Sequence, residues 1–271
     1  MSALTLTLRE QPGHGLDVSL LTPDRLRGLS PAAISALPLC NGNRRQQLSS
    51  LFDISGNDAQ QLVILNSNRH LHGIGSGMTS GHIRIEGDCG NHLGQGMING
   101  TIETSGNSGH WTASGMRDGI ITVAGNCGNF AGGALPGDRQ GMRGGTLLVH
   151  GNCGDRTGDH MRRGYILVAG NAGAYCGTRM VAGTIAVLGK VGPEPGYAMK
   201  RGTLLLCEVP GMLPATFNDC GIHNLGFLHL LTTSIAALDS RFAGQNTGKY
   251  RVHRYAGDLA VDGQGELLVW V

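Results

Sequence analysis

Aromatic residues and proline are scarce in this sequence of 271 residues, with aromatics at 4% and nine prolines. Apolar residues still make up 40% of the chain, which is enough to form a core and excludes wholesale disorder. No apolar run approaches the ~20 residues that span a bilayer. The first eight residues alternate like a strand and lack the basic and apolar blocks of a signal peptide. We therefore expect a cytoplasmic protein that does not associate with membranes.

Charge of one sign is also lacking, because 21 Lys and Arg residues face 19 Asp and Glu residues. A net charge of +2 does not favour nucleic acid as a partner. The seven cysteines are odd in number and form no Cys-x-x-Cys pair, which indicates reduced thiols rather than a disulfide framework.

Catalytic motifs are absent as well. The sequence contains no Gly-x-Ser-x-Gly, phosphate loop or His-Glu-x-x-His. The carboxylates Glu86 and Glu103 fall at different repeat positions, which disfavours glycoside cleavage. We predict no catalytic residue and no metal site in this chain. The role of the pair His70 and His72 stays open.

Glycine is abundant, with 46 residues, and it is periodic. The repeat unit is Met-x-x-Gly-x-Ile-x-Val-x-Gly-Asn-x-Gly, and successive units are 19 residues apart except for one spacing of 26. Residues 134–140 account for that longer spacing and should bulge outward as a loop. The seven repeat methionines are Met78, Met97, Met116, Met142, Met161, Met180 and Met199.

Apolar β-branched residues alternate between the paired glycines of each unit, which is typical of short strands. A unit of 19 residues is too short for a strand and a crossover helix. The sequence therefore predicts an all-β fold: a right-handed parallel β-helix, or single-stranded solenoid, of about seven coils stacked at ~4.8 Å. One inward row would comprise Ile83, Ile102, Ile121, Leu147, Ile166, Ile185 and Leu204, and the methionines would form another.

Two further columns are predicted on the turns. Asp88 and the Asn residues at the same position in the following units should form a polar ladder, because Asn bonds within its own turn. A second column contains Trp111, Phe130, Arg156 and Tyr175, which would stack, with Arg156 placed between two rings.

A basic stripe is the first candidate binding feature. The residue after each repeat Met is cationic in four units: Arg117, Arg143, Arg162 and Lys200. Stacked cations repel one another unless they are solvated or neutralised. They are either ordinary solvated turn residues or a site for an elongated polyanion whose carboxylates are held by Arg forks.

An apolar outer strip is the second candidate feature. The outward position of each strand is polar in the first three coils and becomes Leu148, Leu167, Ala186 and Leu205 in the last four. Exposed apolar strips are costly. The C-terminal helix or a partner subunit should therefore cover Leu148, Leu167 and Leu205.

The flanks are expected to cap the solenoid. We predict an N-terminal cap with entry strands over residues 1–74, the repeat domain over 75–209, and a C-terminal cap over 210–271. Ser30 should cap a short helix, 52–57 should form an early degenerate coil, 223–242 should be a helix, and 250–252 and 267–271 should be strands.

The repeats resemble the C-terminal β-helix domain of glutamate synthase. They also resemble the C subunits of two related complexes, formylmethanofuran dehydrogenase and the bacterial formyltransferase/hydrolase complex. The flanks favour the C subunits. Residues 22–26, 29–30, 42–43 and 51–53 are similar to their entry segment, and residues 213–221, 254–258 and 263–267 are similar to their exit segment.

This resemblance implies a non-catalytic scaffold subunit of a multi-subunit complex in which formyl passes between tetrahydromethanopterin and a methanofuran-type carrier and is hydrolysed to formate. It implies that this chain binds no cofactor, that zinc lies in a partner subunit, and that the carrier has a glutamate-rich tail. The basic stripe is then a candidate site for that anionic tail.

Three alternatives remain open at this point. The chain could be the C subunit of a tungsten or molybdenum formylmethanofuran dehydrogenase, a stand-alone β-helix enzyme acting on an anionic substrate, or a free-standing structural solenoid.

Overall fold

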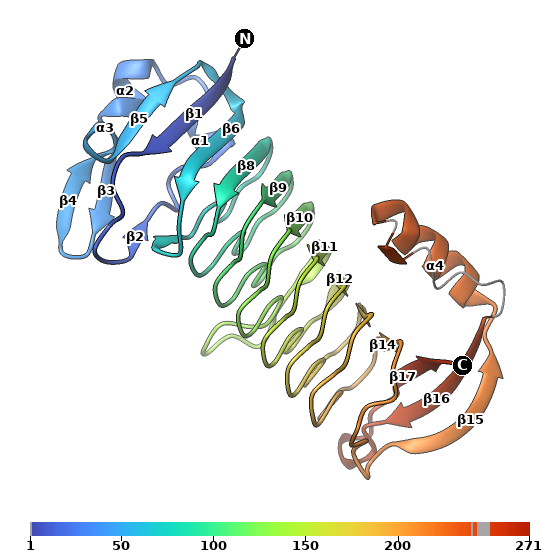
Figure 1. Cartoon of the computed structure of the whole chain (residues 1–271). Helices are drawn as coiled ribbons and strands as arrows, with labels where there is room; N and C mark the ends of the chain where they lie inside the picture. Colours follow the sequence, from blue (N-terminus) through green and yellow to red (C-terminus); the bar gives the residue numbers. More distant parts are fainter. Residues whose placement is uncertain (1, 240, 243–249) are drawn as a thin grey trace.

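The computed structural model describes residues 2–239, 241–242 and 250–271. Its dominant feature is a mostly parallel sheet of 13 strands that runs the length of a stack of coils (Figure 1). The strands of the parallel row, in spatial order, are β1 (Ala3–Leu8), β6 (Asp58–Ser67), β8 (His82–Gly87), β9 (Thr101–Thr104), β10 (Ile120–Val123), β11 (Arg143–Val149), β12 (Arg163–Val168), β13 (Thr184–Val187), β14 (Thr203–Leu206) and β17 (Gly265–Trp270).

Equivalent repeat positions lie directly over one another, as the spacing predicts. Ile102 of β9 pairs with Ile121 of β10, which pairs with Leu147 of β11 across the longer unit. All seven members of the inward row and all seven repeat methionines are 0% exposed. Burial of each such side chain contributes about 1.5–3 kcal/mol, so these two rows form the centre of the core.

Glycine is required where coils touch. Gly119 has a φ of +96°, and a Cβ there would lie 2.5 Å from the carbonyl oxygen of Gly100 in the coil before. A Cβ on Gly145 would lie 2.7 Å from the carbonyl oxygen of Gly119. These three glycines therefore form the single column that the repeat predicts.

The predicted asparagine ladder is confirmed. The side-chain oxygen of Asn107 accepts a hydrogen bond of 2.8 Å from the backbone N–H of Asn126, and the oxygen of Asn126 accepts one of the same length from Asn152. The ladder continues to the N–H of Lys190. Each coil thus satisfies a turn donor of the next coil with a side chain.

A second polar ladder, which the repeat pattern did not reveal, runs beside the first. It begins at His72, whose Nδ1 accepts a hydrogen bond of 2.9 Å from the N–H of Asn91. Asn91 accepts from the N–H of His110, and His110 from that of Asn129. His72 is therefore the first rung of this ladder, and burial lowers its pKa, which favours the neutral ring that can accept the bond.

The N-terminal region covers one end of the stack. It contains α1 (Pro23–Leu26), α2 (Pro31–Ser35), α3 (Leu48–Leu51) and a small sheet of β2 (Leu16–Asp17), β3 (Pro38–Asn41), β4 (Arg44–Gln47) and β7 (Leu71–His72). The Ser30 hydroxyl accepts from the N–H of Ala33 at 3.2 Å, so the predicted cap is confirmed.

The early coil predicted over 52–57 is wrong. Residues Phe52–Ser55 form β5, which pairs antiparallel with β1 at the edge of the sheet. A Cβ on Gly56 would collide with the carbonyl of Ala3, so this glycine serves the close crossing of β1 rather than a repeat turn.

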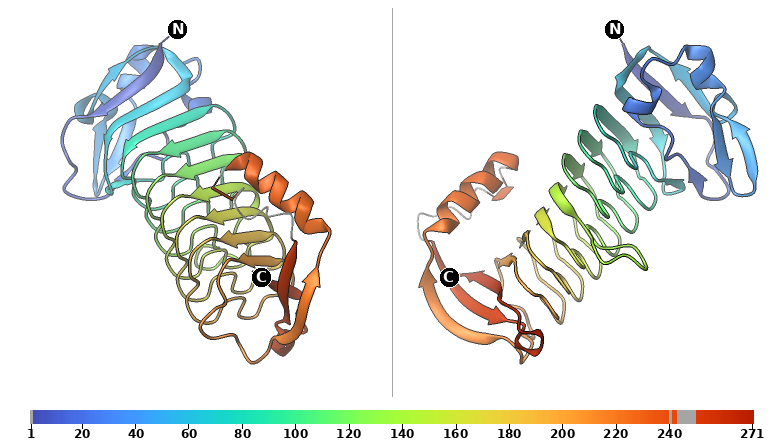
Figure 2. Two further views of the ribbon diagram at one scale, coloured as in Figure 1. Left: turned by 45° about the vertical axis from the view of Figure 1, so that its right-hand side comes forward. Right: turned by 180° about the vertical axis from the view of Figure 1, so that it is seen from behind.

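The C-terminal region closes the other end. The strand β16 (Arg251–Gly257) pairs antiparallel with β17, and β15 (Asn218–Asn224) pairs antiparallel with β16 at the edge of the sheet (Figure 2). The helix α4 spans Phe227–Leu238, shorter than the predicted 223–242, because residues 218–224 are strand; residue 240 of that prediction lies outside the described residues. The carboxylate of Asp258 accepts from the N–H groups of Ala198 and Ala260, at 2.9 and 3.0 Å, and so links this region to the last coil.

Among the residues described, no helix combines the length and apolar character needed to cross a membrane.

Candidate functional site

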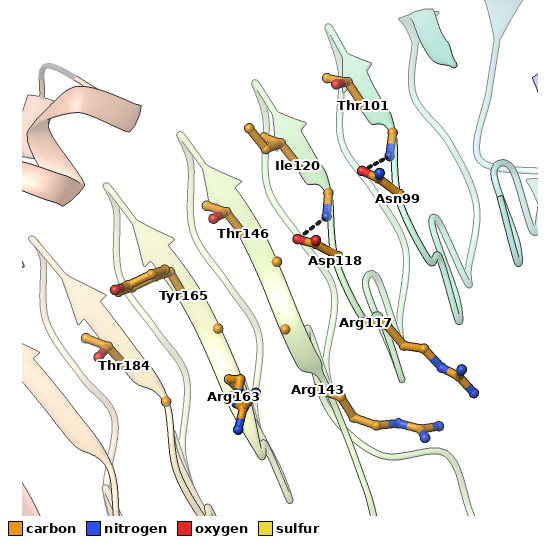
Figure 3. Close-up of a pocket in the computed structure, with 16 residues that line it drawn as sticks. Asn99, Thr101, Arg117, Asp118, Ile120, Arg143, Thr146, Arg163, Tyr165 and Thr184 are labelled. Carbon is orange, nitrogen blue, oxygen red and sulfur yellow. Dashed lines mark hydrogen bonds between the residues drawn. The ribbon is translucent and has the colours of Figure 1, made fainter. Parts of the chain in front are cut away.

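A groove of about 860 Å³ runs across successive coils on one side of the strand row (Figure 3). Six glycines contribute to its lining, and five strands from β9 to β13 each contribute a further residue: Thr101, Ile120, Thr146, Tyr165 and Thr184. Three exposed cations, Arg117, Arg143 and Arg163, also line it. We call this feature the basic groove.

The coil geometry brings the three arginines together. The N–H of Arg143 donates to the carbonyl of Met116, so Arg143 lies one coil beyond Arg117. A Cβ on Gly144 would lie 2.1 Å from the carbonyl oxygen of Arg117, so only glycine permits this approach. A register shift after Arg143 then makes Arg163, rather than Arg162, its partner across β11 and β12.

The predicted stripe is therefore divided. Arg117 and Arg143 line the basic groove, and Figure 3 shows their side chains extending in the same direction. Arg162 is exposed but does not line the groove, and its neighbour Arg163 does. Lys200 lies further along, and its Nζ donates to the carbonyl of Val261 in the C-terminal region.

The groove arginines are not held in ion pairs, although the exposed carboxylate of Asp118 lines the same groove. Arg117, Arg143 and Arg163 form no ion pair with any residue that the structure describes. Like charges on neighbouring coils, whose backbones are ~4.8 Å apart, repel one another. An anion bound between them removes that repulsion and adds charge-assisted hydrogen bonds.

The polar groups at one end of the groove are already occupied. Asn99 and Asp118 each accept a hydrogen bond from the N–H of the following glycine, at 2.7 and 2.8 Å. Gly144, Arg163 and Ala182 hold the corresponding positions in later coils and have no side-chain oxygen. The N–H of Gly183 donates no hydrogen bond within the described chain, so it is available to an acceptor in the groove.

The outer strip lies beneath α4. Leu148, Leu167 and Leu205 are at most 5% exposed and form one cluster with Leu228 and Ile235 of the helix. Figure 2 shows α4 running alongside the strand row. His150 and Asp239, at 3.0 Å, form a polar contact between the stack and the end of the helix. These leucines are thus in contact with the chain's own C-terminal region.

The stacked side-chain column is present as predicted. Trp111 lies between His92 and Phe130, with ring centroids 5.4 Å apart on each side. The guanidinium of Arg156 lies 5.9 Å from the Phe130 ring and 5.0 Å from the Tyr175 ring. Every member of this column has a positive φ, which holds the side chains in one row along the turn.

A second groove, of about 410 Å³, lies where the inserted residues 134–140 cross this column. Trp111, Phe130 and Arg156 form one wall, and residues 134–138 form another. We call it the insert groove. The repeat pattern predicts the column and the insertion separately but not the space between them.

Asp159 is a buried carboxylate at this groove, with its side chain 3% exposed. Arg179 forms two hydrogen bonds with it, and the Nδ1 of His160 lies 3.0 Å from it. Burial lowers the pKa of His160, which outweighs the adjacent carboxylate and favours the neutral ring. Arg179 therefore compensates the charge of Asp159.

Among the described residues, no three His, Cys, Asp or Glu side chains gather as ligands for a metal ion. His72 is occupied by the second polar ladder. Arginine side chains and glycine backbone line the basic groove, whereas the insert groove combines two guanidinium groups with two carboxylates and an imidazole. The class of protein that these features define is a glycine-rich solenoid of stacked 19-residue coils.

Comparisons with known proteins agree with this class. A family model described as the GXGXG motif matches residues 61–225. The chain is 41% identical over 89 residues to the C subunit of the formyltransferase/hydrolase complex of Methylorubrum extorquens, covering 33% of this chain and 34% of that one. It is 29% identical over 95 residues to the C subunit of a tungsten-containing formylmethanofuran dehydrogenase of Methanococcus maripaludis, covering 34% and 35%.

A solved structure is similar over nearly the whole chain. It is the crystal structure of the formyltransferase/hydrolase complex of Methylorubrum extorquens with methylofuran, matched at a TM-score of 0.93 and 39% identity over 98% of this chain and 99% of that one. The sequence alignments span about a third of the curated relatives' length. The chain belongs to the GXGXG-motif family, and within that family it is similar to the C subunits of formyltransferase/hydrolase and formylmethanofuran dehydrogenase complexes.

Proposed function

We propose that this chain is the scaffold and carrier-binding subunit of a formyltransferase/hydrolase complex that interconverts formyl-tetrahydromethanopterin, a formylated methanofuran-type carrier and formate. The observation that carries this proposal is the structural match at a TM-score of 0.93 and 39% identity with a chain of such a complex. The catalytic steps, including zinc-dependent hydrolysis, then belong to partner subunits in the cytoplasm.

The carrier tail is the ligand that we propose for the basic groove. A glutamate-rich tail presents repeated carboxylates, and the groove presents Arg117, Arg143 and Arg163 on successive coils without acidic partners. Arg162 and Lys200 extend the cationic surface beside it. A bound tail would keep the carrier attached while its formyl end visits the centres of the partner subunits.

The fold in this proposal is a right-handed parallel β-helix. Its coils keep 19 residues, and the left-handed hexapeptide type uses 18 with an apolar residue every six. An experimental map that resolves the winding of residues 78–206 decides the hand.

Isolation of the native assembly tests the main proposal. A tagged copy of the full chain, expressed in its own organism, is purified and its companions are identified by mass spectrometry. We expect further subunits at fixed ratios and formyltransferase and hydrolase activity in the particle. A stable, solitary chain would contradict the scaffold role.

The dehydrogenase version is the second candidate, because the relatives include the C subunits of tungsten- and molybdenum-containing enzymes at 29% and 32% identity. Elemental analysis of the same particle separates the two. Zinc without tungsten or molybdenum favours the hydrolase complex, and stoichiometric tungsten or molybdenum favours the dehydrogenase.

A further inference from the structure

The insert groove contains a cation, Arg156, that has no ion-pair partner among the described residues. The Cζ of Arg156 lies 5.9 Å from the centroid of the Phe130 ring and 5.0 Å from that of the Tyr175 ring, within cation–π distance of both. Arg156 forms no ion pair or side-chain hydrogen bond with the residues that the structure describes. The in-plane N–H edge of its guanidinium remains free, and that edge is the part that binds a carboxylate in a bidentate fashion.

The other charged groups at the groove leave Arg156 as the guanidinium that can bind a carboxylate. Arg179, the other guanidinium at the groove, is committed to the buried Asp159 by two hydrogen bonds. Asp138 lies on the inserted segment and does not pair with Arg156. Asp159 is thus neutralised by Arg179, and Asp138 is exposed to solvent. Arg156 is therefore the guanidinium that remains without an ion-pair partner among the described residues.

The turn backbone brings polar side chains to this groove. His160 and Arg179 have φ of 55° and 52°, at a turn position that is occupied by Gly77, Gly96 and Gly115 in earlier coils. A left-handed conformation is strained for a residue with a side chain. Here it places His160 and Arg179 around Asp159, next to the only coil that carries the insertion.

We propose that the insert groove is a second carboxylate-binding site, with Arg156 as the anchoring fork and residues 134–138 as the opposite wall. Its size of about 410 Å³ suits one or two acidic residues of a chain rather than a large cofactor. The carboxylate can come from the carrier tail or from an acidic segment of a neighbouring subunit. The site is separate from the basic groove, because the two share no lining residue.

Nuclear magnetic resonance of the full chain tests the site directly. The sequence has two tryptophans, and only Trp111 lines this groove, so its indole N–H signal, assigned with Trp270→Phe, reports on it. The probe is a triglutamate peptide, with trilysine as the control. We expect a saturable shift of the Trp111 signal with triglutamate and none with trilysine.

Variants connect the shift to Arg156. Arg156→Gln should weaken the binding of triglutamate about tenfold or more. Arg156→Lys keeps the charge but loses the two-pronged guanidinium, so its affinity should lie between those of the wild type and Arg156→Gln. Asp138→Asn should tighten binding by about twofold, since it removes a like charge. Arg143→Gln, in the basic groove, should leave the Trp111 titration unchanged.

The result that overturns the proposal is a Trp111 signal that does not move, or one that moves equally in the Arg156→Gln chain with its thermal midpoint unchanged. Failure of the basic groove to bind the carrier would not affect this titration, so the two proposals fail separately.

Mass spectrometry of an Arg156→Gln complex then identifies the source of the carboxylate. Loss of bound carrier assigns it to the tail, and loss of a subunit assigns it to a neighbour. An unchanged complex together with an unmoved Trp111 signal contradicts the site.

Discussion

A pair of glycine substitutions tests whether successive coils are in direct backbone contact. Gly119 and Gly96 both have positive φ, +96° and +64°. A Cβ at Gly119 would lie 2.5 Å from the carbonyl oxygen of Gly100, and a Cβ at Gly96 would meet nothing within 4 Å. The two sites therefore share the backbone strain and differ in the contact.

The magnitudes follow from these two contributions. Strain alone costs about 1–2 kcal/mol, so Gly96→Ala should lower the free energy of unfolding by that amount. Gly119→Ala adds overpacking against a backbone oxygen that cannot rotate away, which costs about 1–3 kcal/mol more. We expect a total of about 2–5 kcal/mol for Gly119→Ala.

Urea unfolding followed by far-ultraviolet circular dichroism measures both variants. In a stacked-repeat protein, stability is roughly the sum of unit and interface contributions, so the difference between the variants isolates one interface. Equal destabilisation by Gly96→Ala and Gly119→Ala would refute the reasoning, because it would mean that the coils do not approach each other at Gly119.

Three further outcomes are expected. Leu167→Ala, at a side chain 0% exposed under α4, should cost about 2–5 kcal/mol and speed amide exchange in α4, with the exposed Leu230→Ala as the matched control. Burial alone would raise the pKa of Asp258, but hydrogen bonds from Thr216, Ala198 and Ala260 outweigh it and lower the pKa. The stability that this carboxylate contributes is therefore present above its unfolded pKa, about 3.9, and lost as the pH falls through the lower folded value; Asp258→Asn should remove that acid dependence of amide exchange in β16 and β17. Thiol titration of the native chain should modify the exposed Cys40 and Cys220 rapidly, Cys207 slowly, and the four buried cysteines only after unfolding, since burial raises the pKa of Cys176 to about 12 and that of Cys207 to about 11; rapid modification of four or more thiols would contradict the described burial.

The structure of the repeat could be predicted because stacking gives residues at the same position in successive units the same surroundings. Every 19th residue meets its own counterpart, so Ile102 and Ile121, or Asn107 and Asn126, are selected by the same contacts. Period and residue type therefore predict both the inward row and the asparagine ladder. The flanks lack that constraint, and Gly56 has the same spacing cues as a repeat glycine although it serves an antiparallel crossing.

The sites were only partly predictable. The spacing placed Arg117 and Arg143 on adjacent coils, but the register shift that brings Arg163 into the groove depends on the close backbone approach at Gly144. The insert groove depends on how residues 134–140 fold back over Trp111 and Phe130, which no periodicity encodes. The second polar ladder mixes Asn, His and Asp, so its members were visible only as scattered side chains.

The carrier content of the purified complex is the most direct test of the proposal that this subunit holds the carrier. The complex is prepared with the wild-type chain and with Arg117→Gln, Arg143→Gln and Arg163→Gln combined, and bound carrier is quantified by mass spectrometry after washing at rising salt. We predict that the variant complex keeps all its subunits and loses its carrier at lower salt than the wild type. Equal carrier content and equal salt dependence in the two complexes would contradict the account.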